Sequence, residues 1–180
     1  MHATGSRVRQ AGPQDAARCL EIYRPYVENS SVSWEPDVPS VDEMAARITA
    51  ANDTHAWQVI DTGDQTIGFA YGHEYSRFPA FRWSVQTGLY IADDHQRGGG
   101  GRMLYTHLLS RLGERGYRRA FAAIAQPNEP SNAFHRSMGF QDVGLYRRVV
   151  WKHGNWHDVA WMQIELPGPA DPADPPGLIT

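Results

Sequence analysis

The sequence predicts an α/β domain in which a mixed β-sheet is flanked by helices. Two observations support this prediction. Strand-like and helix-like segments follow one another in the order β-α-α-β-β-β-α-β-α-β-β, which is typical of such a sheet. Four consecutive glycines, residues 98–101, stand between a strand-like run and a helix-like run. A chain of 180 residues is long enough to bury one substantial core, so we expect a single domain.

The first part of the chain is predicted to hold one strand and two helices. Residues 7–11 alternate in polarity, as a half-buried strand does. Pro13 then opens a helix with an apolar stripe, because its fixed φ suits the first helical turn. After a loop with two prolines, Ser40 and Glu43 form a capping box for a second helix that reaches about residue 51.

The rest of the chain is predicted to complete the sheet. Residues 55–75 contain two strands joined by a tight turn at residues 62–64. The further expected elements are a strand at 82–92, a helix at 101–115 ended by Gly116, a strand at 118–125, a short helix at 129–139, and closing strands at 143–150 and 159–166. Residues 167–180 are rich in proline and acid, so we expect one domain over 1–166 and a disordered tail.

Composition excludes several classes of protein. Hydrophobic residues make up 41% of the chain and charged residues 21%, as in an ordinary globular protein. A formal net charge of -3 gives no reason to expect a nucleic-acid partner. Cys19 is the only cysteine, which excludes an intrachain disulfide, and we interpret it as a buried small hydrophobe. No apolar run is long enough to span a bilayer, so we expect a cytoplasmic protein without a membrane partner.

The four glycines predict an anion-binding turn. The free amides of a first helical turn converge on one point, and the positive end of the helix dipole lies behind them. Glycine lets the backbone approach a phosphate closely. A Walker A loop would need Lys and then Ser or Thr after the last glycine, whereas Arg102 and Met103 follow; a dinucleotide fingerprint would need glycine at position 103. A flexible hairpin loop is the plainer alternative.

The motifs resemble those of a known family. Gln96-Arg97-Gly98-Gly99-Gly100-Gly101 is similar to the Q/R-x-x-G-x-G/A motif of the GCN5-related N-acetyltransferases. The segments LYTHLLSRL, QPNEPS, FHRSMGF and KHGNWHDV resemble the phosphinothricin N-acetyltransferase group, over roughly residues 8–166. The resemblance implies a mixed, mostly antiparallel sheet flanked by helices, a homodimer, and transfer of acetyl from acetyl-CoA to a small primary amine by direct attack on the thioester.

The resemblance also implies which residues bind acetyl-CoA. The backbone of Leu89, Tyr90 and Ile91 would pair with the pantetheine arm, and a backbone amide of this strand would stabilise the oxyanion. The amides of Arg97, Gly98, Gly99, Gly100, Gly101 and Arg102 would hold the pyrophosphate. Asn128 and Ser131 would contact the cofactor arm, although an N-x-x-S sequence also caps helices. Gly100 stands where relatives commonly carry an apolar residue that packs beneath the loop.

The catalytic assignment is less direct, because the expected base is missing. Attack on a thioester needs a free amine, and the family usually carries a glutamate where this chain has Gln86. Glutamine cannot take up a proton, but it can orient a water or the ammonium. Either another group is the base, or the reaction relies on proximity and the small equilibrium fraction of free amine. Glu35 is our candidate substitute, with a solvated loop acid as the alternative. His135 lies where many relatives have tyrosine, near the leaving thiol; a packing histidine is the alternative reading.

The resemblance of the KHGNWHDV segment predicts the acceptor amine, whereas a second departure from the family pattern favours another amine. Relatives often have R-x-R, which suits a carboxylate; here Arg77 and Arg82 are displaced and Phe78 replaces the second arginine. We expect the acceptor to be an amino acid or an analogue such as phosphinothricin or methionine sulfone. Acetylation of another amine (an antibiotic or a polyamine) and an acyl-CoA-binding module without turnover are the alternatives. We expect no metal, because the spacing in KHGNWHDV does not suit a helical histidine pair.

Overall fold

The computed structural model describes residues 5–168 and confirms the predicted order of elements. The strands are β1 (Ser6–Gln10), β2 (Ala56–Thr62), β3 (Gln65–Glu74), β4 (Ser84–Ile91), β5 (Arg119–Ala125), β6 (Gln141–Lys152) and β7 (Asn155–Glu165). The helices are α1 (Ala16–Glu28), α2 (Val41–Thr54), α3 (Gly100–Glu114) and α4 (Glu129–Ser137). The predicted tail lies almost wholly outside the described residues.

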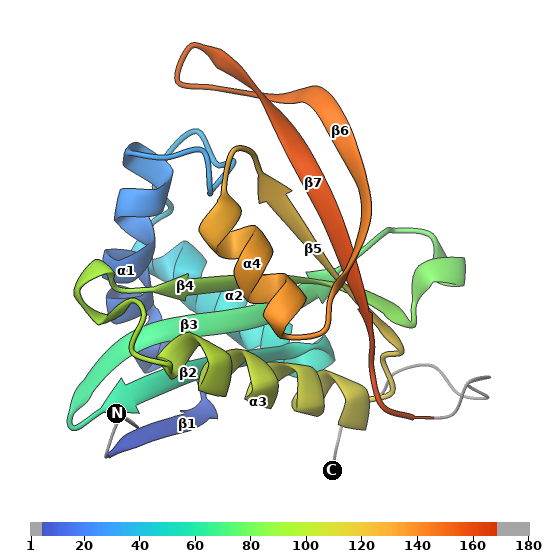
Figure 1. Cartoon of the computed structure of the whole chain (residues 1–180). Helices are drawn as coiled ribbons and strands as arrows, with labels where there is room; N and C mark the ends of the chain where they lie inside the picture. The colour runs from blue at the N-terminus through green and yellow to red at the C-terminus, as the bar shows by residue number, and fades with distance from the viewer. Residues whose placement is uncertain (1–4, 169–180) are drawn as a thin grey trace.

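The seven strands form one sheet in the order β1-β2-β3-β4-β5-β7-β6. Every neighbouring pair is antiparallel except β4 and β5, which run parallel. This is the predicted mixed, mostly antiparallel sheet. Figure 1 shows α3 and α4 on one side of it and α1 and α2 on the other. Each face therefore has its own hydrophobic core.

The local chemistry explains why the elements begin and end where they do. The hydroxyl of Ser40 accepts a hydrogen bond from the Glu43 amide (3.1 Å), and the Ser40 amide donates to the Glu43 carboxylate (2.7 Å), so the predicted capping box is confirmed. Gly63 adopts a φ of +60° in the turn between β2 and β3. Gly116 has a φ of +105° just beyond α3, where the chain leaves the helix.

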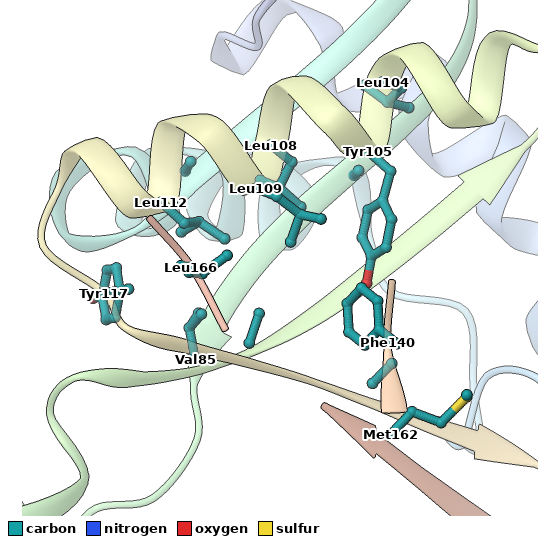
Figure 2. Close-up of a cluster of buried hydrophobic side chains, with 14 of the residues drawn as sticks. Val85, Leu104, Tyr105, Leu108, Leu109, Leu112, Tyr117, Phe140, Met162 and Leu166 are labelled. Atoms are coloured by element: carbon teal, nitrogen blue, oxygen red, sulfur yellow. The ribbon is translucent and has the colours of Figure 1, made fainter. Parts of the chain in front are cut away.

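The core under α3 is the larger of the two and supports the middle of the sheet. Leu104, Tyr105, Leu108 and Leu112 of α3 are fully buried. Figure 2 shows Tyr105, Leu108 and Leu112 turned toward the side of α3 on which Val85, Phe140 and Met162 lie; these three come from the sheet and the loop after α4. The opposite core contains Cys19, whose burial raises the pKa of its thiol to about 12. The interpretation of Cys19 as a buried hydrophobe is confirmed.

The closing strands are longer than predicted. β6 and β7 form a hairpin whose two turn residues, His153 and Gly154, have φ values of +51° and +73°. Two positive φ angles suit the twist of a two-residue hairpin turn. The KHGNWHDV segment is therefore the tip of this hairpin, which extends past the rest of the sheet in Figure 1. Its length was underestimated because its apolar side chains are largely exposed and do not alternate cleanly.

The position of Gly100 gives a test of the packing beneath the glycine turn. Gly100 is buried, and a Cβ added there would lie 3.4 Å from Ile60 Cδ1 and 3.6 Å from Ile67 Cδ1, which is ordinary contact. We expect Gly100→Ala to raise the free energy of unfolding by about 0.5–1 kcal/mol, because alanine restricts the unfolded chain and fits the helix better. Urea unfolding measures this; a loss of stability would show that the turn cannot accept a methyl group.

Candidate active site

The parallel pair β4 and β5 separates soon after it forms. Its register runs only from Ser84 opposite Arg119 to Gln86 opposite Phe121. At the next residue, the Thr87 hydroxyl donates to the carbonyl of Phe121 (3.1 Å) and is hydrogen-bonded to the Tyr105 hydroxyl (2.6 Å). Beyond this point the two strands diverge without further register pairs. The carboxyl-terminal half of β4 therefore faces an opening in the sheet.

A cavity of about 560 Å³ occupies this opening; we call it the fork cavity. Its lining comes from both faces of the sheet. The residues are Tyr23, Val32, Trp34, Glu35, Pro36, Tyr71, His73, 86–90 of β4, 122–125 of β5, Asn128, Ser131 and His135. The cavity thus contains Gln86, Glu35, His135, Leu89, Tyr90, Asn128 and Ser131 from the predicted site. Ile91 is not part of its lining; the Ile91 carbonyl accepts a hydrogen bond from the Tyr26 hydroxyl (2.6 Å).

The glycine turn lies beside the end of β4. Gly99 is the N-cap of α3 with a φ of +83°, and no side chain caps the helix. The amides of Gly100, Gly101 and Arg102 belong to the first helical turn, which has no intrahelical acceptor for them. A Cβ on Gly101 would contact Ile91, Leu89 and Phe134, so the turn is packed against the fork. This is a geometry that can hold an anion, as predicted.

The arginines of this turn have different surroundings. Arg97 lies in the left-handed region, with a φ of +65°, and its side chain is exposed. The Arg102 guanidinium donates to the Ser137 hydroxyl (2.6 Å) and to the Ser137 carbonyl (3.3 Å) at the end of α4. Arg102 therefore ties α3 to α4, while its backbone amide stays in the first turn. Arg97 is the exposed cation at the predicted pyrophosphate position.

The α4 residues of the predicted site combine packing with access to the cavity. The Asn128 side chain accepts from the Ser131 amide (3.2 Å), so Asn128 caps α4. His135 Nδ1 lies 2.8 Å from the Ser131 carbonyl, which can only accept, so Nδ1 carries the proton. Burial lowers the pKa of His135, an effect that this hydrogen bond partly opposes. The ring is packed among Tyr105, Phe134 and Phe140.

Glu35 lines the cavity but is engaged in an ion pair. Its carboxylate accepts two hydrogen bonds from Arg47 (2.5 and 3.0 Å) and one from the Tyr23 hydroxyl (2.9 Å). Burial alone would raise the pKa of Glu35, but the hydrogen bonds from Arg47 and Tyr23 outweigh it and hold the pKa below its ordinary value. A carboxylate with a depressed pKa is a weak base at neutral pH. The assignment of Glu35 as the base stays a prediction.

Glu35→Gln tests that assignment. A base at Glu35 requires the acidic limb of the pH–rate profile to vanish in the variant. The ion pair with Arg47 leads us to expect that the limb stays and that KM for the acceptor rises, because the pair fixes the loop rather than moving a proton. Since the folded-state pKa is depressed, Glu35 remains ionised until the pH falls below its ordinary value of about 4.3, and its stabilising effect is lost only there. Steady-state rates from pH 4 to 9 separate the two outcomes.

The displaced arginines do not reach the cavity. The Arg77 guanidinium lies over the Phe78 ring at 5.3 Å, and the Arg82 guanidinium lies over the Trp83 ring at 4.6 Å. Phe78 is exposed over 58% of its surface and is not part of the cavity lining. The structure therefore does not bring Arg77, Phe78 and Arg82 together with the other predicted site residues.

Residues that the sequence analysis missed surround the α1–α2 loop. Lys152, at the tip of the hairpin, donates from Nζ to the Ser33 carbonyl (2.5 Å) and is buried. Tyr23 is hydrogen-bonded to the Ser33 hydroxyl (2.6 Å) and also reaches Glu35. Lys152 belongs to the KHGNWHDV motif, and this motif was the one sequence feature that could have pointed to it. The partners of Tyr23 and Lys152 are distant in sequence, so no local pattern marks them.

A second cavity adjoins the first on the α1–α2 side. It has a volume of about 440 Å³, and we call it the aromatic cavity. Tyr23, Tyr71 and His73 line both cavities. The rest of its lining is largely apolar and comprises Met44, Arg47, Ala50, Ala51, Thr54, His55, Trp57, Phe69, Gly72 and Glu74. The walls can therefore accept an apolar group next to the fork.

Within residues 5–168, no group of three His, Cys, Asp or Glu side chains is placed to hold a metal ion. His153 lies in the hairpin turn and His157 on β7, so the two are not a helical pair. No helix in the described part of the chain is long and apolar enough to cross a membrane.

Known proteins resemble this chain in both sequence and fold. A family model described as an acetyltransferase (GNAT) domain matches residues 8–161. The phosphinothricin N-acetyltransferase of Streptomyces viridochromogenes is 33% identical over 170 residues, 93% of each chain. An L-methionine sulfoximine/L-methionine sulfone acetyltransferase of Pseudomonas aeruginosa is 31% identical over 161 residues, covering 88% of this chain and 94% of the relative.

One similar protein has a solved structure that contains acetyl-CoA. The phosphinothricin acetyltransferase of Sinorhizobium meliloti, in complex with AcCoA, superposes with a TM-score of 0.84 at 32% identity, covering 89% of this chain and 88% of that one. The predicted fold is thereby confirmed, and so is the predicted N-acetyltransferase class. The chain belongs to the GNAT acetyltransferase family.

Proposed function

We propose that this enzyme transfers the acetyl group of acetyl-CoA to the primary amine of a small amino acid or amino-acid analogue. The observation that carries the proposal is the fork cavity, which is lined from both faces of the sheet and adjoins the free amides of a helix start. The named acceptors of the relatives, phosphinothricin and methionine sulfoximine or sulfone, support this class of substrate. A relative in Escherichia coli, 28% identical, is an L-amino acid N-acyltransferase.

The chain offers the groups that acetyl-CoA binding needs. The amides of Gly100, Gly101 and Arg102 suit the pyrophosphate, because a helix start combines free donors with a positive dipole end. The unpaired edge of β4 beyond Gln86 suits the amide groups of a pantetheine arm. The acceptor then enters from the α1–α2 side, so that its amine meets the thioester in the fork. Attack is direct, without a covalent enzyme intermediate.

The aromatic cavity leads us to expect an apolar side chain on the acceptor. We expect Ala50→Phe to lower kcat/KM for acceptors with large side chains by at least about tenfold, while glycine-sized acceptors are unaffected, because Ala50 is exposed on α2 and lines only this cavity. A tenfold change corresponds to about 1.4 kcal/mol, the value of one or two lost methylene contacts. Equal losses for all acceptors would contradict the assignment.

A second candidate acceptor is an amine without a carboxylate. Arg77 and Arg82 lie over aromatic rings, and Arg47 is the only arginine among the described residues that line either cavity. Arg47 is already paired with Glu35. Comparing an amino acid with its decarboxylated amine separates the candidates. An enzyme that acts on amino acids has a much lower kcat/KM for the amine than for the amino acid, whereas an enzyme that acts on amines without a carboxylate has a higher kcat/KM for the amine.

The deciding experiment is a thiol-release assay with acetyl-CoA. Phosphinothricin, methionine sulfone, the common amino acids and several other amines are tested in parallel. Turnover confined to amino acids and their analogues supports the proposal, and turnover only on other amines supports the second candidate. Binding of acetyl-CoA without turnover on any amine would contradict both and favour a binding module.

We further propose that the enzyme is a homodimer that works in the cytoplasm. Six large apolar side chains of the β6–β7 hairpin are exposed: Val143, Leu145, Tyr146, Val149, Trp151 and Trp156. Several large apolar side chains exposed on one hairpin are typical of a subunit contact. Light scattering after size exclusion should give twice the mass of one chain, and Trp151→Lys should shift it toward the monomer. The single, buried Cys19 fits a reducing compartment.

A further inference from the structure

Acetyl transfer to an amine leaves one role unfilled in this chain. Amino-acid amines are mostly protonated at neutral pH, so a base must remove a proton before the nitrogen can attack. Gln86 cannot do this. Six titratable side chains line the fork cavity: Tyr23, Glu35, Tyr71, His73, Tyr90 and His135. The tyrosines have raised pKa values through burial and remain protonated, while Glu35 is committed to Arg47.

The two histidines differ in position. His135 is held among three aromatic rings on the α3–α4 side, away from the loop that faces the acceptor. His73 is on β3, where it pairs in antiparallel register with Gln86 of β4. Residues directly opposite in an antiparallel pair point to the same face, with Cβ atoms about 5 Å apart. His73 is therefore the cross-strand neighbour of the residue that stands in the expected base position.

The hydrogen bonding of His73 leaves one ring nitrogen available. Nδ1 lies 3.1 Å from the backbone carbonyl of Glu74, which can only accept, so Nδ1 carries the proton. Nε2 then has its lone pair free, and no side chain or backbone group of residues 5–168 is hydrogen-bonded to it. The side chain is accessible and lines both cavities. An accessible imidazole with an unprotonated Nε2 can accept a proton from a bound ammonium.

The charged and titratable groups around His73 keep the ring neutral. The protein atoms packed around the ring displace part of its water and lower the pKa of His73, although the side chain stays partly exposed; the Glu74 carbonyl and carboxylate oppose this only in part. Tyr71 lies next to it on β3, with ring centroids 5.8 Å apart, and stays protonated. His55 faces it from the end of α2, and burial together with His73 lowers the pKa of His55 to about 4. Glu35 lines the same cavity but is neutralised by Arg47.

We propose that His73 is the general base of this enzyme and has taken the place of the carboxylate that is absent at Gln86. This inference rests on the proposed function. Nε2 accepts a proton from the acceptor ammonium, directly or through one water. The freed nitrogen lone pair forms the C–N bond to the thioester carbonyl carbon, and the C–S bond breaks with its electron pair leaving on sulfur. The thiolate takes the remaining extra proton from nitrogen, and His73 returns its proton to solvent.

His73→Asn tests the role, because its amide nitrogen can still donate to the Glu74 carbonyl. We expect kcat to fall about 10²–10⁴-fold and the acidic limb of the profile, set below pH 6.5 by the lowered pKa, to disappear. KM for acetyl-CoA should not change. His107→Asn is the matched control, since His107 is an exposed histidine on α3 outside both cavities. Its profile should match that of the parent enzyme.

A second variant separates catalysis from structure. In His73→Asn/Gln86→Glu the base is moved across to the neighbouring strand, so we expect part of the rate to return, with the limb shifted toward the pKa of a glutamate. An acidic limb that persists in His73→Asn would overturn the proposal, and so would a rate loss that Gln86→Glu cannot rescue. If the parent enzyme turns over and only these tests fail, the proposed function stands. No turnover of any amine by the parent enzyme would overturn both.

Discussion

Replacing Gly99 by valine is expected to raise KM for acetyl-CoA by at least about tenfold. Gly99 has a φ of +83°, which a β-branched residue adopts only at a cost of about 1–2 kcal/mol. Apart from its chain neighbours, nothing lies within 4 Å of the position that a Cβ would take, so the added side chain enters open space at the helix start. An anion must occupy that space to reach the free amides. Initial rates at varied acetyl-CoA measure the effect.

The control for Gly99→Val is a second glycine with the same kind of backbone. Gly63 has a φ of +60° in the β2–β3 turn, and a Cβ there would also meet nothing within 4 Å. Gly63→Val therefore adds a similar strain far from the glycine turn, and both variants should lose similar stability in urea. Only Gly99→Val should weaken the binding of acetyl-CoA. An equal rise of KM in both variants would mean that strain, not the anion site, is responsible.

Tyr105→Ala is expected to give the largest loss of stability, about 3–5 kcal/mol. Tyr105 is fully buried and contacts Phe134, His135 and Phe140 (Figure 2 shows its ring above Phe140). Its hydroxyl also holds Thr87 where β4 and β5 separate. Such a loss is a large part of the 5–15 kcal/mol by which a domain is usually stable. Urea unfolding measures it directly.

Two companion variants complete this test: Tyr105→Phe separates the ring from the hydroxyl, and an exposed residue of the same helix is the control. Tyr105→Phe should cost only about 1 kcal/mol, because the Thr87 hydroxyl can still donate to the Phe121 carbonyl. Met103→Ala, on the same helix at 41% exposure, should change the free energy of unfolding by less than about 0.5 kcal/mol. If Tyr105→Phe lost as much as Tyr105→Ala, the hydrogen bond at the fork would be the dominant contribution.

The elements that sequence could predict are those set by local chemistry. Ser40 and Glu43 mark a helix start by themselves, and Gly63 and Gly116 mark a turn and a helix end. The glycine run marked the uncapped start of α3 for the same reason, because a free helix start needs only neighbours along the chain. Local patterns of this kind account for the order of elements and for the cofactor side of the candidate site.

The acceptor side depends on contacts that no local pattern encodes. His73 lies opposite Gln86 because the segment 75–83 brings β4 back along β3 in one particular register. The sequence alone does not show where the two strands end or how this segment is folded. Glu35 was found as a loop acid, but its partner Arg47 lies on another element. The hairpin was underestimated because exposed apolar side chains on β6 hide the alternation. What a residue contacts across the fold decides its chemistry here.

The fork divides the work of recognition between two kinds of atom. In the proposed binding mode the donor meets backbone amides and a strand edge, which substitutions of side chains scarcely alter. The acceptor would meet side chains of the α1–α2 loop and β3, which line the fork cavity. Selection can therefore change the acceptor through single exchanges while the donor remains the same. This asymmetry makes the fold evolvable, because the product of a duplicated gene can change its acceptor amine while its binding of the acyl donor stays unchanged.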